Sequence, residues 1–405
     1  MTNNSPSSHY FRPDHYLKYP IVLKSAEGTS LKDIKGKEYL DFFAAMGTVS
    51  CGHNNQMINK AFIKQVNTIW ASSFFPTDTQ LLAISRINSV LPEGLEVISL
   101  YSTGAESIEH AIRLARKATG RKRIITFRDH FHGKTHGTMF LAQFFPDCYG
   151  ATPDSYRTVI QSDGRDDPDQ IMEYLDAASG DDLAAVIFEP VIGYSGPRRL
   201  HEGFLRTVRE FCDKNSAVMI VDEILTGFQR CKGWFLSCQD DIRPDIICFG
   251  KGLGNGYPVS GIAVIDSIAG FLKNSLPGST FAGNSLACAI GLSVIDFMSQ
   301  ENFSDKTRQL EKLFFDYFAE TRFRSYGIEL DGIGALLSIG LEDKSFKEME
   351  EIYLNILREG VITSFTRTNL RITPPLTIDI NEFQRGLEVI GKCIQNFWDL
   401  GSNKC

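Results

Sequence analysis

A lysine follows closely on a predicted buried strand in the stretch PDIICFGKGLGNGYPVSG, residues 244 to 261. The apolar run from Ile246 to Phe249 predicts the strand, and Lys251 lies just beyond it, between Gly250 and Gly252. A strand end rich in glycine is a place where a ligand or another backbone approaches closely. A lysine amine at such a position can act as a nucleophile towards a carbonyl compound.

Other reactive residue types follow neighbouring strand-like runs. Asp222 and Glu223 come directly after AVMIV, and Thr103, Gly104 and Ala105 come after VISLY, where they open a helical pattern. In open α/β sheets, ligands bind outside the carboxyl ends of the strands. We therefore expect the acid, the lysine and the small-residue turn to meet at one edge of a sheet.

These three features match the three parts of pyridoxal 5′-phosphate. A helix N-terminus behind a small-residue turn binds phosphate through its free N–H groups and the helix dipole. A carboxylate such as Asp222 pairs with the pyridinium nitrogen, and a lysine such as Lys251 forms a Schiff base with the aldehyde. The sequence therefore predicts this cofactor.

A metal site and a nucleotide loop are alternative interpretations of two other stretches. HFHGKTH brings His130, His132 and His136 close together, but no carboxylate or cysteine completes a ligand set there, so we expect no metal. GKGLGNG is rich in glycine but lacks the spacing of a phosphate-binding P-loop.

The elements that must position these residues alternate in type between about residues 95 and 265. Strand-like runs (VISLYST, RIITF, AAVIFEP, AVMIVDE, DIICFG and GIAVID) alternate with helical patterns such as AESIEHAIRLARKATG and GFLRTVREFCDKN. This alternation predicts an α/β fold with a mostly parallel sheet flanked by helices on both faces. In the last 100 or so residues, amphipathic helical patterns with short strand-like runs between them predict a smaller α+β domain. Near the N-terminus, the stretch GTSLKDIKGKEYLDFFA predicts a hairpin that turns at Lys35 and Gly36.

Composition narrows the class of protein. The 405 residues carry a net charge of −7 without a basic block, which argues against nucleic acid as a partner. No apolar run reaches the roughly 18 residues of a membrane span, and the polar N-terminus shows no secretory signal. The 9 cysteines form an odd set without a CxxC motif, so we expect reduced thiols and a cytoplasmic location.

Taken in order, the motifs resemble those of the class III aminotransferases, which have the aspartate aminotransferase fold (fold type I). The stretches that carry the resemblance are GTSLKDIKGKEYLDFFAAMGTVSCGHNN, STGAESIEHAIRLAR, FHGKTHGT, FEPV, VDEILTGFQR, PDIICFGKGLGNGYPVSG, GSTFAGNSLACA and LRITPPL. The resemblance implies a large cofactor-binding domain over residues 56–295. A small domain would be built from an N-terminal segment, 1–55, and a C-terminal part, 296–405.

The resemblance also implies roles for the residues of the cofactor site. Lys251 would be the Schiff-base lysine and proton shuttle, and Asp222 would keep the ring nitrogen protonated. The phosphate would be bound by Thr103, Gly104 and Ala105.

Further positions complete this implied site. Phe131 would stack on one face of the ring, Ile224 would pack on the other, and His132 of the aromatic-His-Gly stretch would also belong to the cofactor site. Thr280 would reach the phosphate bound in the neighbouring subunit of a homodimer with shared active sites. Arg371 would bind a substrate carboxylate, for which its planar fork is suited.

Each of these residue types also has a structural interpretation. A lysine beside glycines is often a surface residue, and Asp222 with Glu223 could cap a helix. Phe131 could belong to the core, and Arg371 could be structural.

Two positions depart from the pattern of the family. Many members carry a glutamate where this sequence has Tyr194 in EPVIGYSG, and that glutamate pairs with the carboxylate-binding arginine. Many also carry a glutamine, which contacts the phenolic oxygen of the cofactor, where Leu225 stands here. Both departures weaken an assignment to the ornithine, acetylornithine or γ-aminobutyrate branches, and they place Tyr194 among the candidate substrate-binding residues.

The predicted function is a ping-pong aminotransferase that moves an amino group from a small-molecule donor to a keto acid or aldehyde. The alternatives are an aminomutase or epimerase of the same fold, a decarboxylase, and a non-catalytic protein that binds the cofactor.

Overall fold

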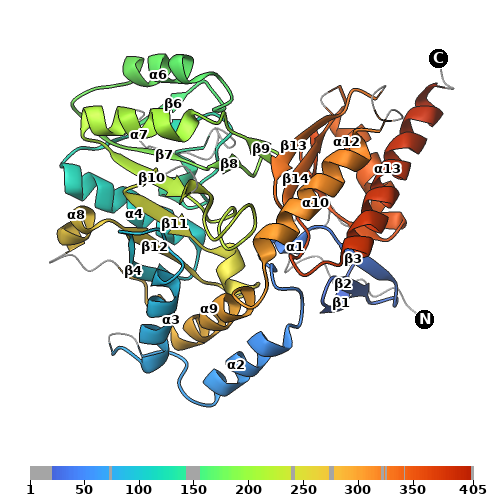
Figure 1. Ribbon diagram of the computed structural model, residues 1–405, viewed down its shortest axis with the longest axis horizontal. Helices are drawn as coiled ribbons and strands as arrows, with labels where there is room; N and C mark the ends of the chain where they lie inside the picture. Colours follow the sequence, from blue (N-terminus) through green and yellow to red (C-terminus); the bar gives the residue numbers. More distant parts are fainter. Residues whose placement is uncertain are drawn as a thin grey trace, which may run out of the picture.

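The computed structural model describes residues 21–72, 75–142, 156–238, 242–272, 278–320, 323, 326–341 and 343–402. The polar N-terminus, Cys148 and Cys405 lie outside these residues. Two lobes lie side by side, a larger one that holds the central part of the chain and a smaller one near both termini (Figure 1). Within the described part of the chain, no helix is both long and apolar enough to cross a membrane.

A seven-stranded sheet forms the centre of the larger lobe. Its strands are, in spatial order, β4 (Glu96–Tyr101), β12 (Ser260–Val264), β11 (Ile246–Phe249), β10 (Val218–Asp222), β7 (Leu183–Phe188), β5 (Arg123–Phe127) and β6 (Arg157–Ile160). Strand β12 runs antiparallel to both of its neighbours, and the other strands are mutually parallel. The predicted mostly parallel sheet is therefore confirmed, although its edge strand β6 was not predicted.

Helices cover both faces of this sheet, as alternating side chains of one strand show. Val218 and Ile220 of β10 pack on the side of helix α4 (Gly104–Thr119), together with residues of α8 (Asp266–Ala269). Met219 and Val221 pack on the opposite side, beneath α6 (Pro168–Ala177) and α7 (Phe204–Asn215) (Figure 1). A strand buried on both faces must be apolar throughout, which is why these strands appear as continuous apolar runs in the sequence.

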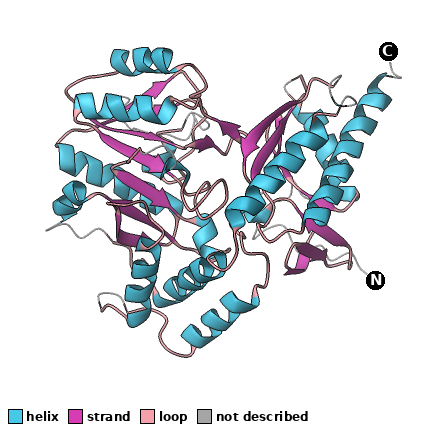
Figure 2. Cartoon of the chain, in the orientation of Figure 1, coloured by secondary structure: helices cyan, strands magenta, loops and turns pink. Residues whose placement is uncertain are grey.

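Three further helices extend the larger lobe: α2 (Gln56–Val66), α3 (Asp78–Asn88) and α9 (Ser285–Met298). Figure 2 shows them together at the bottom of the view, and α3 and α9 pack against residues of the large sheet. Short elements connect the strands: α5 (His136–Met139), η3 (Leu236–Cys238), η4 (Lys251–Gly254), η5 (Gly270–Leu272) and the ribbon β8 (Val191–Ile192) with β9 (Arg198–Arg199).

The smaller lobe combines two sheets with three long helices. One sheet has the order β1 (Leu23–Glu27), β2 (Ser30–Asp33), β3 (Glu38–Asp41) and β15 (Val361–Ile362), and the other β13 (Glu329–Ile333), β14 (Leu336–Gly340), β17 (Asn369–Ile372) and β16 (Ser364–Phe365). The helices are α10 (Phe303–Phe318), α12 (Phe346–Arg358) and α13 (Ile380–Ser402). Because β15 pairs with β3, this α+β lobe draws on both ends of the chain. The boundaries at residues 55 and 295 stay a prediction.

The N-terminal hairpin is confirmed as β2 and β3. These strands pair antiparallel, and Asp33 Oδ1 accepts from the N–H groups of Lys35 and Lys37 in the turn between them. Gly36 adopts φ +86°, a conformation in which a side chain would be strained.

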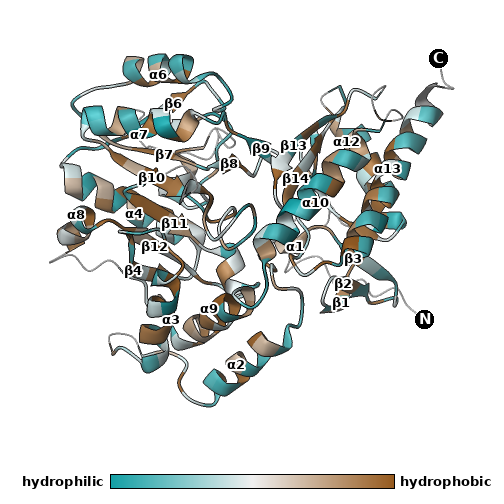
Figure 3. Ribbon diagram, viewed as in Figure 1, coloured by the Kyte–Doolittle hydropathy of each residue, from teal (hydrophilic) through white to brown (hydrophobic). Residues whose placement is uncertain are grey.

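Amphipathic helices enclose the smaller lobe. In α10 the buried residues Phe303, Thr307, Leu310, Phe314 and Phe318 recur every three or four positions, which places them on one face. Figure 3 shows the remaining, hydrophilic surface of α10 and α13 in teal against brown strands.

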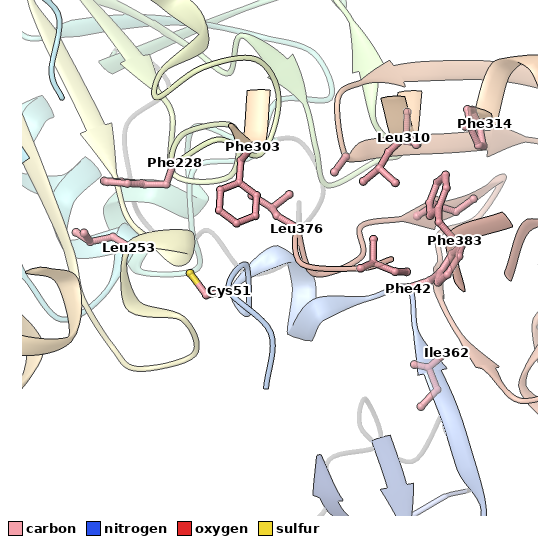
Figure 4. Close-up of a cluster of buried hydrophobic side chains, with 14 of the residues drawn as sticks. Phe42, Cys51, Phe228, Leu253, Phe303, Leu310, Phe314, Ile362, Leu376 and Phe383 are labelled. Atoms are coloured by element: carbon pink, nitrogen blue, oxygen red, sulfur yellow. The ribbon is translucent and has the colours of Figure 1, made fainter. Parts of the chain in front are cut away.

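One apolar cluster joins the two lobes (Figure 4). Phe228 and Leu253 of the larger lobe belong to the same cluster as Leu310 and Leu376 of the smaller one. A buried polar contact adds to it: the Arg230 guanidinium donates to the carbonyls of Ala335 (3.2 Å) and Pro374 (2.6 Å) and to Ser50 Oγ (3.0 Å). A shared core of this kind holds the lobes in a fixed arrangement around whatever lies between them.

Candidate active site

A cavity of about 480 Å³ lies where the carboxyl ends of the large sheet face the smaller lobe. The residues predicted for the site that line it are Thr103, Gly104, Ala105, Phe131, His132, Tyr194, Asp222, Ile224, Lys251 and Arg371. Thr280 does not line this cavity; it is exposed in a turn ahead of α9. The predicted site residues of a single chain therefore lie together in one cavity. Thr280 is the exception, and its predicted role is in the site of the neighbouring subunit.

The N-terminus of α4 forms one wall. Thr103 is the N-cap and its hydroxyl accepts from the Glu106 N–H at 3.3 Å, while the Glu106 carboxylate accepts from the N–H groups of Ser102 and Thr103. The N–H groups of Gly104 and Ala105 have no acceptor among the described residues. Free N–H groups at the positive end of a 16-residue helix form a binding site for an anion.

Buried hydroxyls hold this turn in place. Ser107 Oγ donates to Ser260 Oγ at 2.8 Å, and Ser260 Oγ donates to the Thr103 carbonyl at 2.7 Å. Gly104 is closely packed, because a Cβ atom there would lie 2.7 Å from Ile224 Cδ1 and would force that side chain to shift. Ile224 therefore lies directly against the anion-binding turn.

Asp222 ends β10 and is held on both carboxylate oxygens. His132 Nδ1 lies 2.8 Å from Oδ2, and the Ile224 N–H donates to Oδ1 at 3.1 Å. On its other side, His132 Nε2 lies 3.4 Å from Thr126 Oγ1. His132 thus positions the carboxylate. Among the described residues, no cluster of three or more His, Cys, Asp or Glu side chains is suited to a metal.

Lys251 begins the short helix η4 immediately after β11 and adopts φ +38°. A non-glycine residue in this left-handed region costs on the order of 1 kcal/mol or more, which is typical of functional sites. Desolvation lowers the pKa of Lys251, although the nearby Glu189 and Asp222 partly offset this effect. A lysine with a lowered pKa is a better nucleophile and base at neutral pH.

Glu189 is a cavity residue that was not among the predicted site residues. It follows β7 and accepts from the Phe131 N–H at 2.8 Å. Desolvation, reinforced by the negative charge of Asp222, raises the pKa of Glu189 to about 8. Its place after a predicted strand was a signal in the sequence, since the other site residues occupy such positions.

We expect the ionisation of Glu189 to destabilise the fold as pH rises. Its folded pKa of about 8 lies above its ordinary value of 4.5, so the folded state holds a proton that the unfolded state loses between these values. The difference in unfolding free energy, Glu189→Gln minus wild type, should therefore rise from pH 5 to pH 8 and then level off. Thermal or denaturant unfolding over pH 5–9 measures this difference, and a flat or falling difference would contradict the assignment.

Aromatic rings and a guanidinium form a further part of the cavity wall. Phe131 and Tyr194 stack with ring centroids 4.6 Å apart. Arg371, on β17 of the smaller lobe, donates from Nε to Ser364 Oγ (3.1 Å) and from Nη1 to the Tyr194 carbonyl (3.3 Å). These contacts orient the Arg371 guanidinium at the cavity, where a carboxylate can bind it.

Met46 also lines the cavity, although no motif indicated this placement. Ala44, Ala45, Met46 and Gly47 have φ of 44°, 48°, 64° and 77°, which makes α1 (Ala44–Gly47) a left-handed turn. Left-handed backbone costs about 1–2 kcal/mol per non-glycine residue. Asp41 supports the turn, because its Oδ1 accepts from the Phe43 and Ala44 N–H groups at 2.8 Å.

Comparison with known proteins agrees with this geometry. The sequence profile of the family described as "Aminotransferase class-III" matches residues 11–394. An acetylornithine aminotransferase of Methanopyrus kandleri is 30% identical over 383 residues, which cover 94% of this chain and 96% of that protein.

Solved structures show the same fold. A transaminase from the marine bacterium Virgibacillus superposes with a TM-score of 0.90 at 23% identity, covering 97% of this chain and 98% of that one. The ornithine aminotransferase of Toxoplasma gondii, described with partial occupancy of PLP at its active site, has a TM-score of 0.85 and 26% identity, covering 94% and 92% of the two chains. With a family profile that matches nearly its whole length, the chain belongs to the class III aminotransferases.

Proposed function

We propose that the cavity between the lobes binds pyridoxal 5′-phosphate and that the chain uses it to transfer an amino group from a small-molecule donor to a keto acid or aldehyde. The observation that carries the proposal is the meeting of three groups in one cavity: the α4 N-terminus, Asp222 and Lys251. These groups match in kind the phosphate, the pyridine nitrogen and the aldehyde of that cofactor.

The residues present fit the cofactor. The N–H groups of Gly104 and Ala105 would bind the phosphate, and the close packing of Gly104 against Ile224 leaves no side chain in the way. Asp222, fixed by His132 and the Ile224 N–H, would hold a proton on the ring nitrogen. Phe131 would stack against the ring from the side of Tyr194.

When bound, the cofactor supplies an aldehyde that takes up the amino group and a ring that accepts electrons from the substrate. The chain supplies the rest. The Lys251 amine, with its lowered pKa, would accept the proton from the Cα atom of the substrate and would pass it to the carbon atom of the cofactor that had carried the aldehyde. Arg371 binds the substrate carboxylate and so fixes the orientation of that Cα atom.

A two-stage assay tests the proposed function. The purified protein is mixed with an amino donor alone, and the released cofactor is identified by chromatography; its aminated form should accumulate once per site. Addition of a keto acid or aldehyde should restore the aldehyde form and allow repeated turnover. Turnover without any acceptor would indicate an aminomutase or epimerase instead, and failure of every donor to aminate the cofactor would contradict the proposal.

We further propose that the enzyme is a homodimer. Large apolar side chains are exposed on α2, on α3 and in the segments beside them, notably Ile63 (60%), Trp70 (61%), Phe75 (78%) and Phe281 (66%). These segments lie side by side, since the Ser285 N–H donates to the Trp70 carbonyl at 3.1 Å. Exposed apolar side chains gathered in adjoining segments indicate a protein–protein interface.

Thr280 is adjacent to Phe281 in this region, which supports its predicted contact with the phosphate bound by the partner subunit. Hydrogen bonds to a charged group contribute on the order of 1.5–3 kcal/mol. We therefore expect Thr280→Ala to weaken cofactor affinity by roughly tenfold or more, and Thr280→Ser, which keeps the hydroxyl, to bind nearly as wild type. Titration of the cofactor-free variants with pyridoxal 5′-phosphate measures both affinities, and light scattering determines the number of chains in the assembly. A fully active monomer, or equal affinity in Thr280→Ala, would contradict this role.

The cytoplasm remains the predicted location. It is supported by six cysteines that are free and buried rather than paired: Cys51, Cys212, Cys231, Cys248, Cys288 and Cys393.

A further inference from the structure

We propose that this cavity accepts amino acids with an apolar side chain and rejects those that carry a second ammonium group, an inference that rests on the proposed amino-group transfer. It concerns the part of the cavity beyond the cofactor-binding groups. The wall there is formed by Met46, Leu225 and Leu336, together with the Tyr194 ring.

In the apolar wall, Leu225 is tightly packed between two glycines, Gly47 and Gly193. A Cβ atom on Gly47 would lie 2.9 Å from Leu225 Cδ1, and one on Gly193 would lie 2.4 Å from Leu225 Cδ2. The two methyl groups of Leu225 therefore fill the space beside both glycines. Leu225 also packs against the buried cluster that contains Leu336 and Val191, so this wall continues into the core.

The left-handed turn adds Met46 to the same wall. Gly47 follows Met46 directly, and its close approach to Leu225 brings the two segments together. The turn is anchored through Asp41, whose second oxygen lies 2.9 Å from His53 Nε2. A strained backbone, held by the hydrogen bonds of Asp41, places at the half-exposed rim of the cavity the thioether of Met46, which offers neither a charge nor a strong hydrogen bond to a ligand.

The charged groups of the cavity favour an anion over a second cation. Among the described residues that line it, the cations are Lys134, Lys251 and Arg371, and the acids are Asp222 and Glu189. Asp222 is engaged by His132 and by the Ile224 N–H, and Glu189 accepts from the Phe131 N–H at 2.8 Å. Burial also raises the pKa of Glu189, which disfavours its charged form. An additional ammonium would therefore lose its water without gaining a carboxylate that is not already engaged.

This predicts a difference from enzymes that act on diamino acids. Whichever amine of ornithine reacted, the other would remain as a cation inside the cavity. Norvaline has the same carbon chain without the terminal amine, so its propyl group could lie against Met46 and Leu225 while its carboxylate binds Arg371. The two compounds therefore differ only in the terminal ammonium group, which is the feature that the cavity is proposed to reject.

The test compares L-norvaline with L-ornithine on the cofactor-loaded enzyme near pH 7, with L-alanine and L-glutamate as reference donors. Amination of the cofactor is followed in single turnovers, which yields a rate constant divided by a dissociation constant for each donor. We expect this ratio to be at least about tenfold higher for norvaline than for ornithine.

A matched pair of variants tests the wall itself. Met46→Glu places a carboxylate there and should reduce the preference for norvaline at least about tenfold, because ornithine then gains a partner. Met46→Gln, which is similar in size but uncharged, should keep the preference of the wild type.

The outcomes separate the two proposals. If no donor aminates the cofactor, the proposed function is overturned, and this inference with it. If alanine or glutamate reacts but norvaline does not, or if ornithine reacts as well as norvaline, the proposed function stands and the inference is overturned. An unchanged preference in Met46→Glu would also overturn it.

Discussion

Replacing Lys251 by alanine is expected to reduce amino-group transfer by about 10³-fold or more, because the variant loses both the amine that would attach the cofactor and the base that moves the substrate proton. Among the described residues that line the cavity, the other lysine is Lys134, which is exposed to solvent and is therefore poorly suited to replace Lys251. The measurement is the rate of amination of the bound cofactor in a single turnover with a saturating donor.

The fold should survive this substitution, since alanine fits the same backbone, and thermal unfolding checks it. The matched control is Lys214→Ala, which removes an exposed lysine from a surface ion pair with Asp176 and should change the rate little. A Lys251→Ala variant that is folded and as active as wild type would remove the basis of the proposed mechanism.

The second large effect is expected at Asp222. Asp222→Asn keeps the shape of the side chain but removes the negative charge that would hold a proton on the ring nitrogen. We expect a loss of about 10²-fold or more in the rate of proton removal from the substrate, since general acid–base and electrostatic contributions are of this size. A donor deuterated at Cα should then show a larger isotope effect than with wild type, because proton removal becomes more strongly rate-limiting.

The neighbouring acid provides the control. Glu223 points away from the cavity and accepts from the Ser237 N–H (2.6 Å) and the Ser237 hydroxyl (2.7 Å) as well as from Thr226. Glu223→Gln should therefore lower the unfolding temperature but leave the rate of proton removal close to that of wild type. The opposite pattern, with Asp222→Asn active and Glu223→Gln stable but inactive, would assign the ring-nitrogen contact to Glu223.

Much of the site was predictable because a parallel sheet places the carboxyl ends of its strands at one edge. Lys251, Asp222 and the Thr103 turn each follow an apolar run, so their meeting in one cavity follows from the alternation of strands and helices. Continuous apolar runs also revealed β7, β10 and β11, since these strands are buried on both faces. Glu189 obeys the same rule, although the sequence alone gave no measure of its raised pKa.

Other features depend on contacts between distant segments and were not predictable. The left-handed turn that places Met46 in the cavity is formed by the ordinary residues Ala44 and Ala45, and its support comes from Asp41. Strand β6 is a short edge strand, whose weaker apolar pattern did not distinguish it from a loop. The predicted contact of Thr280 with the phosphate of a partner subunit stays a prediction, because it depends on the proposed assembly of two chains.

Locating the attachment point of the cofactor tests the proposed site most directly. The purified enzyme is treated with borohydride, which fixes a carbonyl cofactor to the amine that holds it, and is then digested and analysed by mass spectrometry. We predict the mass of the reduced cofactor on the peptide that contains Lys251, and its loss when an amino donor is added before the borohydride. A label on a different lysine, or a label on Lys251 that no amino donor diminishes, would contradict the assignment of this cavity as the active site.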